Sequence, residues 1–172
     1  MPTRVGVVSD THLPRFGRRL PGALVRGLVD ARVERIFHLG DFTADFVPDL
    51  FESIAPLDAV AGNNDRPELV ERFGRRRVVD VEGVRFGLTH GDLGPGQTTT
   101  ERAARSFGAD EVDVVLCGHS HIPVVTDLGD GRRHLNPGSP TDKRRQAAYS
   151  WGLVEVDAGR VTRVELRWFD CR

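Results

Sequence analysis

The sequence predicts an α/β (α+β) fold in which helices cover two β-layers. Short β-branched apolar runs recur at steady intervals, segments with helical spacing lie between the earlier runs, and hairpin turn signals dominate the second half. Because 172 residues is an ordinary length for one domain, we expect residues 1–172 to form a single domain. Hydrophobic residues make up 39% of the chain and 19 residues are glycine, a composition that supports a buried core.

The predicted buried strands are short apolar runs bounded by Gly, Asn or Asp, a pattern typical of strands covered on both faces. They are Val5–Ser9, Arg35–Leu39, Leu57–Ala61 and Val112–Cys117. The predicted helices have apolar residues at helical spacing. They are Pro21–Ala31, Ala44–Ile54, a segment that begins near Pro67, and Thr99–Phe107, with Thr98 to Thr100 as candidate N-caps before Glu101.

Paired β-rich segments in the second half predict hairpins, because the residues between the members of each pair favour a turn. The pairs are Arg76–Val81 with Val84–His90, Val124–Asp127 with Arg133–Leu135, and Ser150–Val156 with Val161–Arg167. A second half that is largely β is buried most simply when its strands form a second layer against the first.

Charge and cysteine content exclude several classes of protein. Lys and Arg number 24 and Asp and Glu 25, so the net charge of −1 indicates neither a dedicated nucleic-acid surface nor a polybasic membrane anchor. Two cysteines, Cys117 and Cys171, cannot form a disulfide framework, and the chain has no C-x-x-C motif. No run approaches the ~18 apolar residues of a membrane span and the N-terminus lacks a signal-peptide pattern, so we expect a cytoplasmic protein.

Asp, His and Asn residues gather just beyond the predicted strands, where loops converge at one edge of a sheet. They are Asp10, His12, Asp41, Asn63, His90, His119 and His121. Turn chemistry explains any one of them alone, but it does not explain four histidines at such positions. A structural zinc takes four ligands, so seven suit two ions that share a carboxylate. Imidazole with carboxylate suits Mn, Fe, Zn, Ni or Co better than Ca or Mg alone.

Other polar residues near these positions have a simpler explanation. His38 lies inside a predicted strand and is expected to pack in the core, and Cys117 is expected to behave as a small buried hydrophobe. For His134, which is close to Asn136 in the sequence, both a core role and a role at the site stay open.

The motif order D-x-H, G-D, G-N-x-D, H and G-H-x-H extends from Asp10 to His121. This order resembles that of the calcineurin-like metallophosphoesterase superfamily. The start Val7–His12 and the segment Asn136–Ser139 resemble its small prokaryotic phosphodiesterase branch. The resemblance implies a four-layer α/β/β/α sandwich of two mixed β-sheets with a two-metal site.

The resemblance also implies a role for each ligand. Asp10, His12 and His121 would bind the first metal. Asn63, His90 and His119 would bind the second, and Asp41 would bridge the two. The implied activity is a metal-dependent phosphodiesterase acting on a small phosphate ester, with a hydroxide held between two divalent metals as the nucleophile. Mn²⁺ is the first expectation for the metal, with Ni²⁺, Fe²⁺, Zn²⁺ and Co²⁺ as alternatives.

The sequence departs from the superfamily pattern at Asn64, where many members carry a His that is the usual candidate acid. An amide cannot protonate a leaving group, so we expect a preference for diesters with good leaving groups. The catalytic set implied by the resemblance is Asp41, Asn64, Asp65 and His90. For Asp65 two roles stay open: it could hold Asn64 or a ligand His in place, or cap the helix near Pro67.

Four residues are candidate substrate contacts: Asn64, Arg15, Asn136 and Arg144. Arg15 and Arg144 belong to basic clusters that could bind a phosphate in bidentate fashion, and a solvated charged surface is the equally weighted alternative. Asn136 begins a segment expected to shape the floor of the pocket.

Three other functions compete with the phosphodiesterase. A protein-binding scaffold of the same fold, with little or no catalysis, would be favoured by lost ligands, and every ligand position is filled here. A phosphomonoesterase would use the same ligands. A serine hydrolase with Ser120 as nucleophile is disfavoured because the chain has no G-x-S-x-G elbow. A homo-oligomer is compatible with all of these, and no membrane partner is expected.

Overall fold

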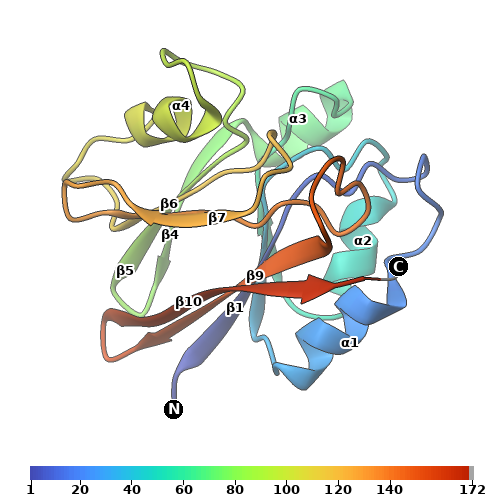
Figure 1. The fold of residues 1–172 in the computed structure, drawn as a ribbon, viewed down its shortest axis with the longest axis horizontal. Coiled ribbons are helices and arrows are strands. Elements are labelled where there is room, and N and C mark those ends of the chain that lie inside the picture. The colour runs from blue at the N-terminus through green and yellow to red at the C-terminus, as the bar shows by residue number, and fades with distance from the viewer. Residues whose placement is uncertain (171–172) are drawn as a thin grey trace.

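The computed structural model describes residues 1–170. Cys171, one of the two cysteines, lies outside the described residues. Within this range the chain forms two five-stranded sheets that pack face to face, with helices on the outer faces (Figure 1). The predicted four-layer α/β/β/α sandwich of two mixed sheets is therefore confirmed.

The first sheet has the strand order β10-β9-β1-β2-β3. Its strands are β1 (Thr3–Val8), β2 (Arg35–His38), β3 (Leu57–Ala59), β9 (Tyr149–Asp157) and β10 (Arg160–Phe169). The first three run parallel, with Val7 opposite Phe37 and Phe37 opposite Asp58. The last two form an antiparallel hairpin whose inner strand pairs with β1.

The second sheet has the order β4-β5-β6-β8-β7. Its strands are β4 (Arg76–Val81), β5 (Val84–Thr89), β6 (Val114–Leu116), β7 (Val124–Asp127) and β8 (Arg133–Asn136). The predicted Glu82-Gly83 hairpin joins β4 to β5, and the three central strands run parallel. Each sheet therefore contains three adjacent parallel strands, so several strand ends lie at one edge.

Four helices form the outer layers: α1 (Gly22–Asp30), α2 (Val47–Glu52), α3 (Pro67–Phe73) and α4 (Thr99–Arg105). Leu28 of α1, Phe51 of α2 and Leu69 of α3 pack in one apolar cluster with the first sheet. Ala103 of α4 packs with Val115 of the second sheet, and Figure 1 shows α4 on the opposite side of the molecule from α1. None of the helices within residues 1–170 has the length and apolar character needed to cross a bilayer.

Three predicted helices are longer than those in the structure. The first, Pro21–Ala31, is longer by one residue at each end, and the second ends two residues early, at Glu52. The helix expected over residues 44–54 begins at Val47, because Pro48 is placed in its first turn and the preceding residues form a turn. The last predicted helix ends at Arg105 instead of Phe107. Its N-terminus is capped as expected, since the Glu101 amide donates to Thr98 Oγ1 at 3.1 Å.

The core between the sheets is apolar and closely packed. Phe37 of β2 and Phe86 of β5 are fully buried and meet edge to face, with ring centroids 5.4 Å apart. This pair joins the two sheets directly beneath the loops that follow them.

Truncation of this contact tests how much the inter-sheet core stabilises the fold. We expect Phe37→Ala to lower the free energy of unfolding by about 3–5 kcal/mol, because it removes a large buried ring and leaves a cavity. Urea denaturation checks this, with Val78→Ala, at a side chain 39% exposed, as a control expected to cost less than about 0.5 kcal/mol. A loss below about 1 kcal/mol for Phe37→Ala would contradict the assigned core.

Candidate functional site

The loops that follow five strands bring the predicted ligands to one edge of the sandwich. They follow β1 (Asp10, His12), β2 (Asp41), β3 (Asn63), β5 (His90) and β6 (His119, His121). The first three strands belong to one sheet and the last two to the other, so the site lies where the sheets meet.

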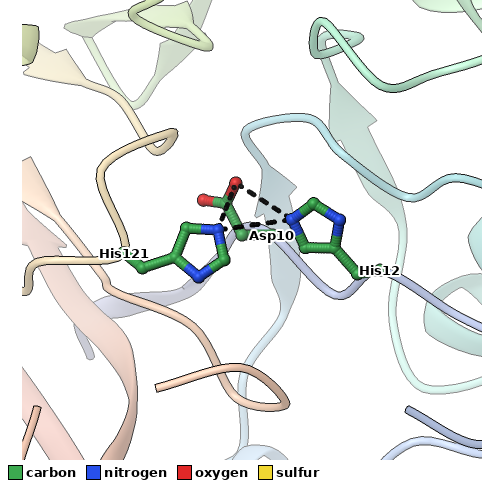
Figure 2. Close-up of side chains that lie close together, drawn as sticks. All are labelled: Asp10, His12 and His121. Atoms are coloured by element: carbon green, nitrogen blue, oxygen red, sulfur yellow. Dashed lines mark hydrogen bonds and ion pairs between the residues drawn. The ribbon is translucent and has the colours of Figure 1, made fainter. Parts of the chain in front are cut away.

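One group of side chains consists of Asp10, His12 and His121 (Figure 2). Asp10 Oδ1 lies 3.4 Å from His121 Nε2 and 3.7 Å from His12 Nε2. The two ring nitrogens are themselves 3.3 Å apart. One oxygen and two nitrogens so close together form a set that could hold a metal ion.

A second group, which shares Asp10, includes Asp41 and His90. His90 Nε2 lies 3.4 Å from Asp41 Oδ2, and the same carboxylate oxygen lies 3.5 Å from His12 Nε2. One oxygen of Asp41 therefore lies within 3.5 Å of a ring nitrogen from each group, His12 in the first and His90 in the second. The ring of His119 lies beside that of His90, with centroids 5.1 Å apart. The His119 Nδ1 atom lies 3.1 Å from Asn63 Oδ1.

Backbone carbonyls determine which ring nitrogen faces the site. His90 Nδ1 lies 2.7 Å from the Leu39 carbonyl oxygen, and His121 Nδ1 lies 2.7 Å from that of Asp142. A carbonyl can only accept a hydrogen bond, so both Nδ1 atoms carry hydrogen and donate. In the neutral rings the lone pair of Nε2 therefore points toward the carboxylates, an arrangement that repels unless a cation lies between them.

The burial of these atoms supports the same conclusion. Asp10 Oδ1 and His90 Nε2 are both inaccessible and have no hydrogen-bond partner, although such groups are costly to bury alone. Burial would raise the pKa of Asp10, but the neighbouring imidazoles of His12, His121 and His90 hold it well below its usual value. Oxygen and imidazole ligands with unsatisfied buried atoms fit a divalent transition-metal ion.

Burial and neighbouring charges also oppose each other in the pKa values of His90 and Asp41. Burial lowers the pKa of His90, but the neighbouring carboxylates of Asp41 and Asp10 outweigh it and raise the pKa to about 9. For Asp41 burial acts in the opposite direction, and its contact with His90 brings the pKa down to about 2. Without an ion the site therefore attracts protons, which supply the positive charge.

The backbone at the ligands is strained. Five of the seven adopt the left-handed conformation, which side chains with a Cβ rarely do; their φ values are 56° (Asp10), 44° (His12), 60° (Asp41), 66° (His119) and 59° (His121). Each such residue costs on the order of 1–3 kcal/mol unless its surroundings hold it in place. Strain of this kind concentrates at functional sites.

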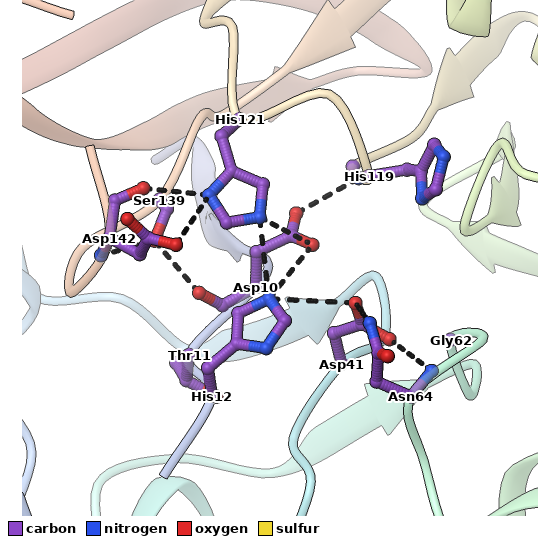
Figure 3. Close-up of polar contacts among 12 residues, drawn as sticks. Asp10, Thr11, His12, Asp41, Gly62, Asn64, His119, His121, Ser139 and Asp142 are labelled. Carbon is purple, nitrogen blue, oxygen red and sulfur yellow. Dashed lines mark hydrogen bonds and ion pairs between the residues drawn. The ribbon is translucent and has the colours of Figure 1, made fainter. Parts of the chain in front are cut away.

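Residues that the sequence prediction missed hold the Asp10 loop (Figure 3). Ser139 Oγ donates to the Asp10 carbonyl at 2.7 Å, and Thr141 Oγ1 donates to the Thr11 carbonyl at 2.7 Å. Asp142 then accepts from His121 through its carbonyl. The motif Asn136–Ser139 was a signal for this segment, but its expected role was the pocket floor, whereas here it supports the ligand loops from behind.

Asn64 and Asp65 hold the Asp41 loop. Asn64 donates twice to the Asp41 carboxylate, from its backbone N at 2.9 Å and from Nδ2 at 2.8 Å. Asp65 accepts from three backbone amides: Asp41 at 2.8 Å, Gly62 at 2.7 Å and Thr43 at 2.7 Å. Burial raises the pKa of Asp65, and these amides oppose the rise. Neither expected role of Asp65 is found, since its carboxylate holds backbone amides and α3 has no side-chain cap.

Two glycines allow the loops to approach. A Cβ on Gly62 would lie 2.1 Å from Asp41 Oδ1, and a Cβ on Gly118 would lie 1.8 Å from Ser9 Oγ and 2.7 Å from Asp10 Oδ2. Any other residue at either position would push a ligand carboxylate or its loop out of place.

The remaining candidates separate clearly. Arg144 lines a cavity of about 490 Å³ that also includes His119 in its wall, whereas Arg15 is exposed beside Phe16 and does not line that cavity. Asn136 is only 2% exposed and donates to the Gly118 carbonyl at 2.8 Å. The expected contact of Asn136 with substrate is therefore replaced by support of the Gly118–His121 loop.

His38 and Cys117 are fully buried, as expected. The His38 ring stacks on Phe42 with centroids 3.7 Å apart, and burial lowers its pKa to about 3, so it is a neutral core side chain. Burial raises the pKa of the Cys117 thiol well above its usual value, so it is not a thiolate ligand.

The electrostatics predict that metal and protons compete. At pH 7 the His90 ring with a pKa of about 9 is protonated in metal-free protein, so Mn²⁺ must displace that proton and its apparent affinity must weaken as the pH falls. Calorimetric titration in two buffers of different ionisation enthalpy should show release of about one proton per protein. Affinity that is constant from pH 6 to 8, without proton release, would contradict this charge balance.

Comparisons with known proteins agree with this geometry. The profile of the calcineurin-like phosphoesterase superfamily domain matches residues 3–159. A probable metallophosphoesterase of Methanothermobacter thermautotrophicus is 38% identical over 141 residues, which cover 81% of this chain and 78% of that protein. A phosphodiesterase of Methanocaldococcus jannaschii is 30% identical over 149 residues, covering 78% and 82%.

The fold is also similar to that of Vps29 from Chaetomium thermophilum. The TM-score is 0.78 at 20% identity, and the alignment covers 99% of this chain and 100% of that one. At this identity the likeness concerns the fold alone. The match of the family profile over most of the chain, together with the two archaeal relatives, shows that the chain belongs to the calcineurin-like phosphoesterase superfamily.

Proposed function

We propose that this protein is a phosphodiesterase whose centre holds two divalent metal ions, with Mn²⁺ as the first candidate. The observation that carries the proposal is the position of Asp41 Oδ2, which lies 3.4 Å from His90 Nε2 in its own group and 3.5 Å from His12 Nε2 in the other. A carboxylate in contact with ligands of both groups could be shared by two divalent ions. The archaeal phosphodiesterase relative supports a diester substrate.

Metal ions in such a centre supply a reactive nucleophile from water and polarise the phosphoryl oxygens. The protein's own residues prepare the place for them. Asp10, His12 and His121 would bind one ion, while Asn63, His90 and His119 would bind the other. Asn64 orients the Asp41 carboxylate through two hydrogen bonds, and Asp65 fixes the backbone of the same loop.

The leaving group receives no proton from Asn64. Its side chain is an amide that donates to Asp41 Oδ2 and has no acidic hydrogen to transfer. We therefore infer that the enzyme favours diesters whose leaving group departs as a stable anion, such as a nitrophenolate.

Hydrolysis of bis(p-nitrophenyl) phosphate tests the proposal. We expect chelator-stripped protein to be inactive, Mn²⁺ to restore activity, and Asp41→Asn to abolish at least 99% of it, because the shared carboxylate loses its charge. Asp30→Asn, at an exposed position at the end of α1, is the matched control and should retain full activity.

Three other outcomes would each count against the diesterase. If folded protein hydrolyses no diester with any added divalent metal ion, a scaffold role is favoured. Faster turnover of p-nitrophenyl phosphate than of the diester would indicate a phosphomonoesterase. Activity retained by Asp41→Asn would show that the reaction does not use this centre.

Arg144 provides a test of substrate attraction. It lines the cavity beside His119, and its ion pair with Asp142 is long at 3.9 Å, so its guanidinium is available to an anionic substrate. We expect Arg144→Gln to raise KM roughly 10-fold, equivalent to about 1.4 kcal/mol, with less effect on kcat. Arg145→Gln, an exposed neighbour that does not line the cavity, is the control. Equal KM changes in both variants would reduce the effect to general surface charge.

A further inference from the structure

The cavity of about 490 Å³ beside the centre has a volume typical of pockets for small molecules. Its wall includes His119, whose Nδ1 atom lies 3.1 Å from Asn63 Oδ1, so the cavity adjoins this part of the site. A group attached to a phosphorus atom at the centre would extend into this space. Which group fits depends on the donors and acceptors of the wall side chains that are not already used in hydrogen bonds within the protein.

Ser120 lies in the wall and can only donate. Asn136 Oδ1 accepts from the Gly138 amide at 3.0 Å, which fixes the orientation of the Asn136 side chain. Asn136 Nδ2 then donates to Ser120 Oγ at 3.0 Å, and the Ile122 amide donates to the same oxygen at 3.2 Å. A hydroxyl accepts two hydrogen bonds and donates one, so Ser120 retains its hydrogen for an acceptor in the cavity.

Thr100 lies in another part of the wall and has the opposite capacity. His134 Nδ1 donates to the Val115 carbonyl at 3.1 Å, and burial lowers the pKa of His134 to about 4, so its Nε2 is an acceptor. Thr100 Oγ1 lies 3.3 Å from His134 Nε2 and donates a hydrogen bond to it. The Cys117 thiol, a weaker donor, lies 3.8 Å from the same nitrogen. The hydrogen of Thr100 is thus directed into the core, and its lone pairs are left for a donor in the cavity.

The rest of the wall does not suit a hydrocarbon chain. Ile122 and Val124 are its only apolar side chains among the described residues, while Thr98, Gln97 and Arg102 add polar groups. A ligand that fills this cavity must therefore satisfy polar atoms as well as occupy space.

We infer that this cavity selects phosphodiesters whose second substituent carries a hydrogen-bond donor, a hydroxyl or N–H group, which Thr100 accepts, while Ser120 donates to an oxygen of the same substrate. The inference rests on the proposed phosphodiesterase function and assigns its specificity. Simple alkyl or aryl diesters offer no donor to the lone pairs of Thr100 Oγ1 and would be poorer substrates.

Two substrates with the same leaving group test this assignment. Thymidine 5′-(p-nitrophenyl phosphate) carries hydroxyl and N–H donors on its second substituent, whereas bis(p-nitrophenyl) phosphate carries none. We expect Thr100→Val to lower the ratio of kcat/KM for the thymidine ester to that for the aryl diester by roughly 3- to 10-fold, the loss of one hydrogen bond. Thr100→Ser, which keeps the hydroxyl, should restore the ratio.

Ser120→Ala should lower kcat/KM for the thymidine ester by a similar factor. The matched control is Ser53→Ala, because the Ser53 hydroxyl donates to the Leu50 carbonyl on α2, away from the cavity. A ratio unchanged by Thr100→Val, or unchanged between Thr100→Ser and Thr100→Val, would overturn the inference. Calorimetric binding of thymidine 5′-phosphate in the presence of Mn²⁺ gives a readout without turnover. If the protein hydrolyses neither diester, the proposed function fails, whereas tighter binding to wild type than to Thr100→Val would still support the cavity assignment.

Discussion

The structure depends on one electrostatic constraint: two carboxylates and several imidazoles converge in a space from which water is largely excluded. Asp10 is fully buried and Asp41 is 2% exposed, and the Nε2 atoms of His90 and His121 that face them present lone pairs when the rings are neutral. Such a set is unfavourable without positive charge between its members. The high pKa of His90 and the low pKa of Asp41 both express this need.

The surrounding chain is built to hold that arrangement. Five of the seven ligand positions have left-handed backbone, and hydroxyl donors from Ser139 and Thr141 fix the carbonyls of the Asp10 loop. Glycines at 62 and 118 leave room for the carboxylates. Beneath the loops, the Phe37–Phe86 contact joins the two sheets, so both halves of the centre rest on one rigid core.

Much of this could be predicted from the sequence, because strands and their ends leave local patterns. The runs before Asp10, Asp41 and His119 are apolar and end in Ser or Gly, and these signals place ligands at one edge. The start of α2 was missed by three residues because apolar spacing continues into the turn before Pro48. The support of His90 by the Leu39 carbonyl left no signal at all, since every residue carries a carbonyl. The role of Asp65 also depends on backbone amides of three residues, which only the folded loops bring together.

The most direct test of a two-ion centre is anomalous diffraction from crystals soaked in Mn²⁺. The account predicts two peaks, one bonded to Asp10, His12 and His121 and the other to Asn63, His90 and His119, with the Asp41 carboxylate bonded to both. A single peak, or two peaks that do not share Asp41, would contradict it.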